Sequence, residues 1–81
     1  MNTSELRFPD GFDAADERGS IRWQLFLHRD VRDVETTDRH DTLRVLHHGA
    51  PDLAGWTASL AEEGYPAPVL LGEAVTASSR G

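Results

Sequence analysis

The spacing of apolar residues changes along the chain, and this change limits the folds that are possible. Alternation at every second residue is typical of a half-buried strand, whereas recurrence every three or four residues is typical of a helix. Strand-like segments occur at 4–8, 29–37, 42–48 and 66–71, and helix-like segments occur at 13–28 and 50–65. The predicted order is therefore strand, helix, strand, strand, helix, strand.

The first helix is predicted from residues that recur at intervals of four and three. Asp13 is a suitable N-cap, and Asp16 and Glu17 suit the positive end of the helix dipole. The Gly19-Ser20 pair is expected to loosen the first turns, because both residues are weaker helix formers than alanine. The residues placed on one face of this helix are Ala14, Arg18, Ile21, Leu25 and His28.

The later segments have equally clear patterns. In the third strand Leu43, Val45 and His47 alternate with Arg44, Leu46 and His48, and a polar turn at 38–41 joins this strand to the second. In the second helix one face is expected to hold Leu53, Trp56, Thr57 and Leu60, and Gly64 is expected to end it. The prolines of the last segment place that strand at an edge or near strand ends.

This order of elements predicts an α+β fold, a ferredoxin-like βαββαβ sandwich with two helices on one face of a four-stranded antiparallel sheet. We expect a single domain over residues 1–72, because 81 residues rarely contain two cores. Small and polar residues predict a disordered tail at 73–81.

The charge and composition exclude several classes of function. A net charge of −6 argues against nucleic acid and against an anionic membrane as partners, because like charges repel. With no cysteine, the chain has no disulfide, no thiolate metal site and no thiol nucleophile. We find neither a signal peptide pattern nor an apolar run long enough to span a membrane, and we therefore expect a cytoplasmic protein.

Three short stretches, GFDAADE at 11–17, DVRDV at 30–34 and LAEEGY at 60–65, together resemble a known family. The chain is similar to heavy-metal-associated domains, the modules of copper chaperones and of metal-pumping ATPases, over about residues 5–71. Such domains have a Gly-Met-Thr-Cys-x-x-Cys loop, two valines in the second strand and a Gly-Tyr after the second helix. The positions that match the second and third of these features are Val31, Val34, Gly64 and Tyr65.

The metal loop of the family is altered in this chain. Gly11 matches, Phe12 replaces the methionine, and Ala14 and Glu17 stand at the two cysteine positions. Soft metals such as Cu(I) select thiolates, so the resemblance implies a degenerate metal site that does not bind them. We expect no cofactor, and we expect Phe12 to anchor the loop in the core.

Two groups of residues could in principle hold a metal ion. Asp10, Asp13, Asp16 and Glu17 offer oxygen ligands for a hard cation, although acidic residues near a helix N-terminus are equally explained by capping. At the opposite pole, His28, His47 and His48 could bind zinc, copper(II) or nickel. A histidine at a helix C-terminus also has a purely electrostatic explanation, and His47 and His48 should point to opposite faces of the sheet.

Trp23 and Phe26 stand three residues apart on the first helix, beside its core-facing line. They form either an exposed contact surface for a protein partner or an apolar edge packed toward Trp56 of the second helix. The sequence leaves both interpretations open.

These observations predict a small, non-catalytic interaction module that binds a protein partner, or a second copy as a homodimer, through the first helix or a sheet edge. The alternative is a metal carrier or sensor that uses histidines and carboxylates. A third possibility is a ligand-binding or catalytic domain that acts as an oligomer. We expect no enzyme activity, because no serine, histidine and carboxylate are arranged for catalysis.

Overall fold

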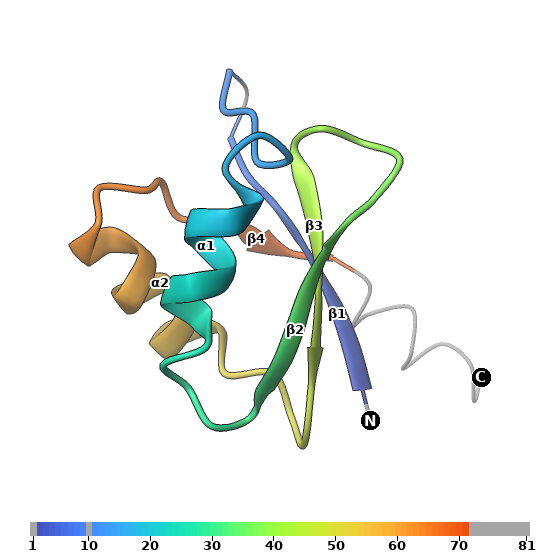
Figure 1. Ribbon diagram of the computed structural model, residues 1–81, viewed down its shortest axis with the longest axis vertical. Helices are drawn as coiled ribbons and strands as arrows, with labels where there is room; N and C mark the ends of the chain where they lie inside the picture. Colours follow the sequence, from blue (N-terminus) through green and yellow to red (C-terminus); the bar gives the residue numbers. More distant parts are fainter. Residues whose placement is uncertain (1, 10, 72–81) are drawn as a thin grey trace.

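The computed structural model describes residues 2–9 and 11–71 (Figure 1). Asp10 and the tail predicted at 73–81 lie outside the described residues. The strands are β1 (Asn2–Arg7), β2 (Val31–Thr36), β3 (Thr42–His47) and β4 (Val69–Leu70), and the helices are α1 (Arg18–Leu25) and α2 (Leu53–Glu62). The predicted order of elements is therefore confirmed.

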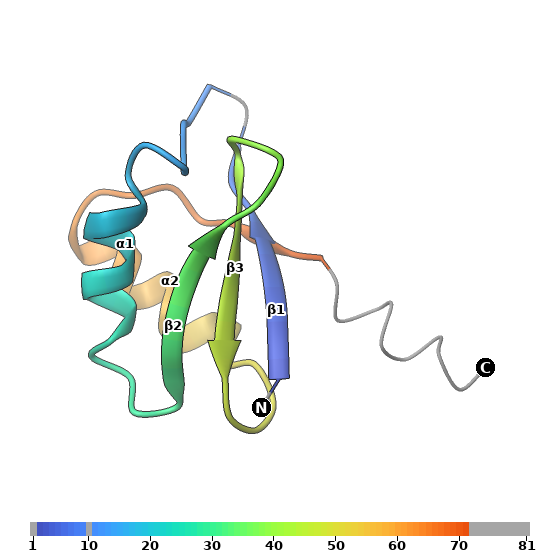
Figure 2. The ribbon, with the colours of Figure 1, turned by 45° about the vertical axis from the view of Figure 1, so that its right-hand side comes forward.

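The four strands form one antiparallel sheet in the order β2-β3-β1-β4. Both helices lie on the same side of this sheet, as Figure 2 shows. The predicted α+β class, with two helices and a four-stranded antiparallel sheet, is confirmed. The long strands β1 and β3 are central, whereas β2 and the two-residue β4 form the edges.

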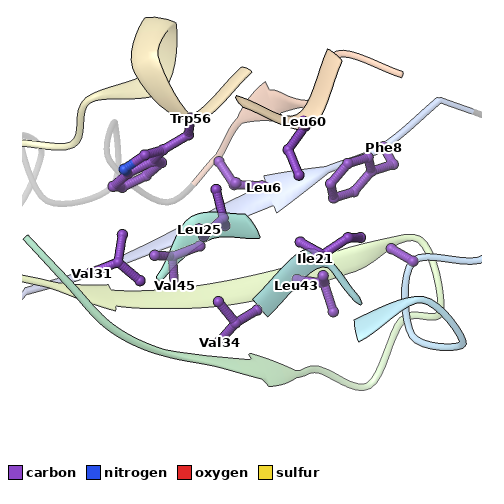
Figure 3. Close-up of a cluster of buried hydrophobic side chains, with 11 residues drawn as sticks. Leu6, Phe8, Ile21, Leu25, Val31, Val34, Leu43, Val45, Trp56 and Leu60 are labelled. Atoms are coloured by element: carbon purple, nitrogen blue, oxygen red, sulfur yellow. The ribbon is translucent and has the colours of Figure 1, made fainter. Parts of the chain in front are cut away.

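The core lies between the sheet and the two helices. Figure 3 shows Trp56 and Leu60 of α2 and Ile21 and Leu25 of α1 gathered with side chains from the sheet. The alternation predicted for the third strand is confirmed, because Leu43, Val45 and His47 are buried and the residues between them are not. The buried apolar residues are Leu6, Phe8, Ala14, Ile21, Leu25, Val31, Val34, Leu43, Val45, Trp56 and Leu60.

The first helix begins later than the sequence predicts. Residues 14–17 form turns, α1 starts at Arg18, and the residue at its N-cap position is Glu17, whose side chain makes no capping hydrogen bond. Asp13 was the wrong N-cap for this helix, and its Oδ1 instead accepts a hydrogen bond from the Asp16 amide at 3.1 Å. The carboxylate therefore stabilises the turn before the helix.

The last strand is also shorter than expected. Strand β4 contains only Val69 and Leu70, because Pro66 and Pro68 have no amide hydrogen to donate to a neighbouring strand.

Helix α2 begins after Asp52, whose side chain accepts a hydrogen bond from the Gly55 amide, and the chain leaves the helix through Gly64 at a φ of +85°. Neither helix in the described part of the chain is long and apolar enough to span a bilayer.

Candidate functional site

An apolar strip lies on the outer side of α1 and just beyond its end. Ile21 and Leu25 of this helix are fully buried, but Trp23 is 70% exposed and Leu27 is 72% exposed. Trp23 lies within α1, and Leu27 lies in the turn that follows the end of this helix at Leu25. We call Trp23, Phe26 and Leu27 the α1 strip. Of the two sequence interpretations for Trp23, the structure favours the exposed surface.

Phe26 is the least exposed member of the α1 strip, at 37%. The Arg22 guanidinium carbon lies 4.3 Å from the centre of its ring, and Arg22 Nε donates a 2.7 Å hydrogen bond to Asp33 Oδ1 on β2. That bond from Arg22, with a second from the Val34 amide, lowers the pKa of the Asp33 carboxyl. Arg22 is thus fixed beside Phe26. Leu27, which was not selected from the sequence, is more exposed than Phe26.

A groove of about 390 Å³ lies beside Trp23, between α1 and the end of α2. Tyr65, on its far wall, is held by two contacts: its hydroxyl donates to Glu17 Oε1 at 3.4 Å, and its ring meets the Phe12 ring edge-on with centroids 5.9 Å apart. The groove therefore continues the α1 strip toward the α2 C-terminus. Its lining residues are Gly19, Ser20, Trp23, Gln24, Glu63 and Tyr65.

The loop that corresponds to the metal loop of the resembled family is packed against its surroundings. Phe12 packs against the core, as predicted for an anchor residue. Its ring is tilted against the Phe8 ring, with the two ring centroids 5.1 Å apart. Ala14 is completely buried, and Glu17 receives the hydroxyl of Tyr65. The Ala15 amide donates to the His40 carbonyl at 2.9 Å, so this loop and the β2–β3 turn share one pole.

Asp41, the last residue of that turn, has a strongly lowered pKa. Arg39 donates two hydrogen bonds of 3.0 Å to its oxygens, and the Thr42 hydroxyl donates one of 2.9 Å. The Arg39 guanidinium, and after it the Thr42 hydroxyl, lower the pKa of Asp41 from 3.8 to about 2. Since the folded protein takes up this proton less readily than the unfolded chain, Asp41 stabilises the fold above about pH 4.

We therefore expect the melting temperature to fall as the pH is lowered from about 4 to about 2. Asp33, whose pKa is lowered as well, contributes in the same direction. The measurement is thermal unfolding followed by circular dichroism between these pH values and neutrality. In the Asp41→Asn control the loss on acidification should be smaller. An unchanged pH profile in that variant would contradict the role given to Asp41.

The histidines predicted as an alternative metal site have separate hydrogen-bond partners. His28 Nε2 lies 2.7 Å from Ser59 Oγ on α2, and His47 Nε2 lies 2.8 Å from Ser4 Oγ on β1. His47 is fully buried at the end of β3, whereas His48, in the bend after the strand, is exposed. No group of three or more potential metal ligands occurs among the described residues.

Neither serine–histidine pair was predicted from the sequence, because each joins segments that are far apart in the chain. The Ser4–His47 pair is buried and inaccessible to a substrate. The Ser59–His28 pair links α2 to the segment after α1, and within the described residues no carboxylate is hydrogen-bonded to His28. Each pair connects two elements of the fold.

Comparison of this chain with known protein families, with curated proteins and with solved structures finds no match.

Proposed function

We propose that this protein is a small, non-catalytic interaction module that binds a protein partner through the α1 strip. The observation that carries the proposal is the exposure of two large apolar side chains close together in the sequence, Trp23 on α1 at 70% and Leu27 just after it at 72%. Exposed aromatic and aliphatic side chains on one surface are typical of binding sites, and tryptophan is among the residues that contribute most to binding energy.

The other surfaces of the domain suit a partner less well. The face of the sheet away from the helices carries a row of charges, in which Arg44 pairs with Glu5 at 3.3 Å and with Glu35 at 3.7 Å. The β2 edge has an irregularity in register between Val31 and Asp33, and a bulge of this kind discourages pairing with another strand. Contact through α1 is therefore favoured over contact through a sheet edge.

We also propose that the fold is ferredoxin-like and related to heavy-metal-associated domains that have lost thiolate binding. The βαββαβ order, the strand order β2-β3-β1-β4 and the placement of both helices on one face support the first part. The buried methyl group of Ala14 and the engagement of Glu17 with Tyr65, at the two cysteine positions, support the second part.

Trp23→Ala is expected to leave stability almost unchanged, within about 0.5 kcal/mol, because most of the indole is already in water. The same substitution should weaken association with the partner. Stability is measured by urea denaturation. Association is measured in cells of the native host with a photo-crosslinking amino acid at position 27, in chains with Trp23 either intact or substituted.

Crosslinking from position 27 should give a discrete adduct that Trp23→Ala reduces. The matched control places the crosslinker at Thr3, which is exposed on β1 and lies next to the buried Ser4. Equal adducts from positions 3 and 27, or no adduct from position 27, would contradict an interaction through the α1 strip.

A further inference from the structure

We propose that the groove beside Trp23 receives a basic side chain, arginine or lysine, of the protein partner. This inference rests on the proposed function and specifies the chemistry of the partner. A partner of this kind carries a basic residue for the groove and a neighbouring apolar residue for Leu27.

The composition of the groove suits a cation on a long side chain. Trp23 and Tyr65 provide aromatic surfaces, and Glu63 provides a carboxylate. Guanidinium and ammonium groups are attracted to the faces of aromatic rings, tryptophan most strongly. Tyr65 is already fixed by Phe12 and Glu17, so part of the wall is in place before a ligand arrives.

The electrostatic field at this end of the molecule also favours a cation. The C-terminus of a helix carries partial negative charge, which proteins commonly offset with basic residues. Helix α2 has no basic residue in its last turn, and Glu62 and Glu63 stand there instead. Within the described residues, neither of these glutamates forms an ion pair. A partner's cation would offset this concentration of negative charge.

The basic residues of α1 itself are directed elsewhere. Arg18 donates a 3.0 Å hydrogen bond to the Val34 carbonyl, and Arg22 is paired with Asp33, so both side chains reach β2. Neither lines the groove. Since no described arginine lines the groove, the proposal takes the positive charge from a partner. A second copy of this chain is disfavoured as the occupant, because each copy carries a net charge of −6.

The test is a nuclear magnetic resonance titration of the full chain with three short blocked peptides. The peptides are acetyl-Leu-Ala-Arg-Leu-amide and its counterparts with glutamine or glutamate in place of arginine. The arginine peptide should shift the Trp23 indole signal and the Gly19 and Ser20 amide signals saturably at millimolar concentration. Its affinity should exceed that of the glutamine peptide about threefold to fivefold, and added salt should reduce the difference.

Two exposed glutamates at the end of α2 give a matched pair of variants. Glu63→Gln should remove most of the preference for arginine, whereas Glu62→Gln, next to it but outside the groove lining, should retain most of it. Equal binding of the arginine and glutamine peptides, no saturable shift with arginine, or equal effects of the two variants would overturn the inference.

These failures would be distinguishable from failure of the proposed function, since crosslinking from position 27 does not depend on the charge of the partner. Sedimentation over a range of concentrations tests the second copy as occupant. We expect a monomer. A dimer that Trp23→Ala abolishes would overturn the proposal that a basic side chain of another protein occupies the groove.

Discussion

Replacing Trp56 by alanine is expected to lower the free energy of unfolding by about 3–5 kcal/mol. The indole is completely buried between α2 and the sheet (Figure 3). Its ring meets the His47 ring edge-on, with centroids 5.2 Å apart. A chain of this length is stable by only about 4–12 kcal/mol, so the variant should be largely unfolded or close to it. Urea denaturation followed by circular dichroism measures the effect.

Trp23→Ala is the internal control for this prediction, because it makes the same chemical change on the other helix. Trp23 is 70% exposed, and its removal leaves no cavity in the core. The two variants should therefore differ by at least about 2.5 kcal/mol. Similar losses in both would mean that Trp23 belongs to the core and would remove the basis of the proposed α1 strip.

The two tryptophans differ in how well their burial could be predicted from the sequence. Trp56 lies on a clear apolar line with Leu60, and both residues are buried as this line predicts. Trp23 lies beside the line through Ile21 and Leu25, where the pattern is compatible with either exposure or packing against α2. The distance and angle between the helices decide this point, and they depend on contacts that are distant in sequence.

Element boundaries depend on similar long-range contacts. The acidic stretch at 13–17 has the composition of a helix start, yet α1 begins only at Arg18, because the turns at 14–17 are held by Asp13, by Tyr65 and by the His40 carbonyl. Local propensity could predict the helix but not these partners. The groove could not be predicted from the sequence either, since its residues come from segments about 40 positions apart.

Ser4 and His47 are the clearest example of a contact that only the fold can create, and they support the second large prediction. Both side chains are buried, and the oxygen and Nε2 are 2.8 Å apart. Within the described residues, His47 Nδ1 and Trp56 Nε1 have no hydrogen-bond partner. Ser4→Ala would leave the imidazole without any partner, which should lower the free energy of unfolding by about 1–3 kcal/mol.

The double variant Ser4→Ala/His47→Leu should recover much of this loss, because it removes both polar groups and leaves an apolar contact against Trp56. His47→Leu alone leaves only the small serine hydroxyl unpaired and should cost less than Ser4→Ala. Urea denaturation of the four proteins gives the coupling energy between the two sites, which we expect to be about 1–2 kcal/mol. Strictly additive losses would show that the short Ser4–His47 contact contributes no net stability beyond the backbone pairing of β1 with β3.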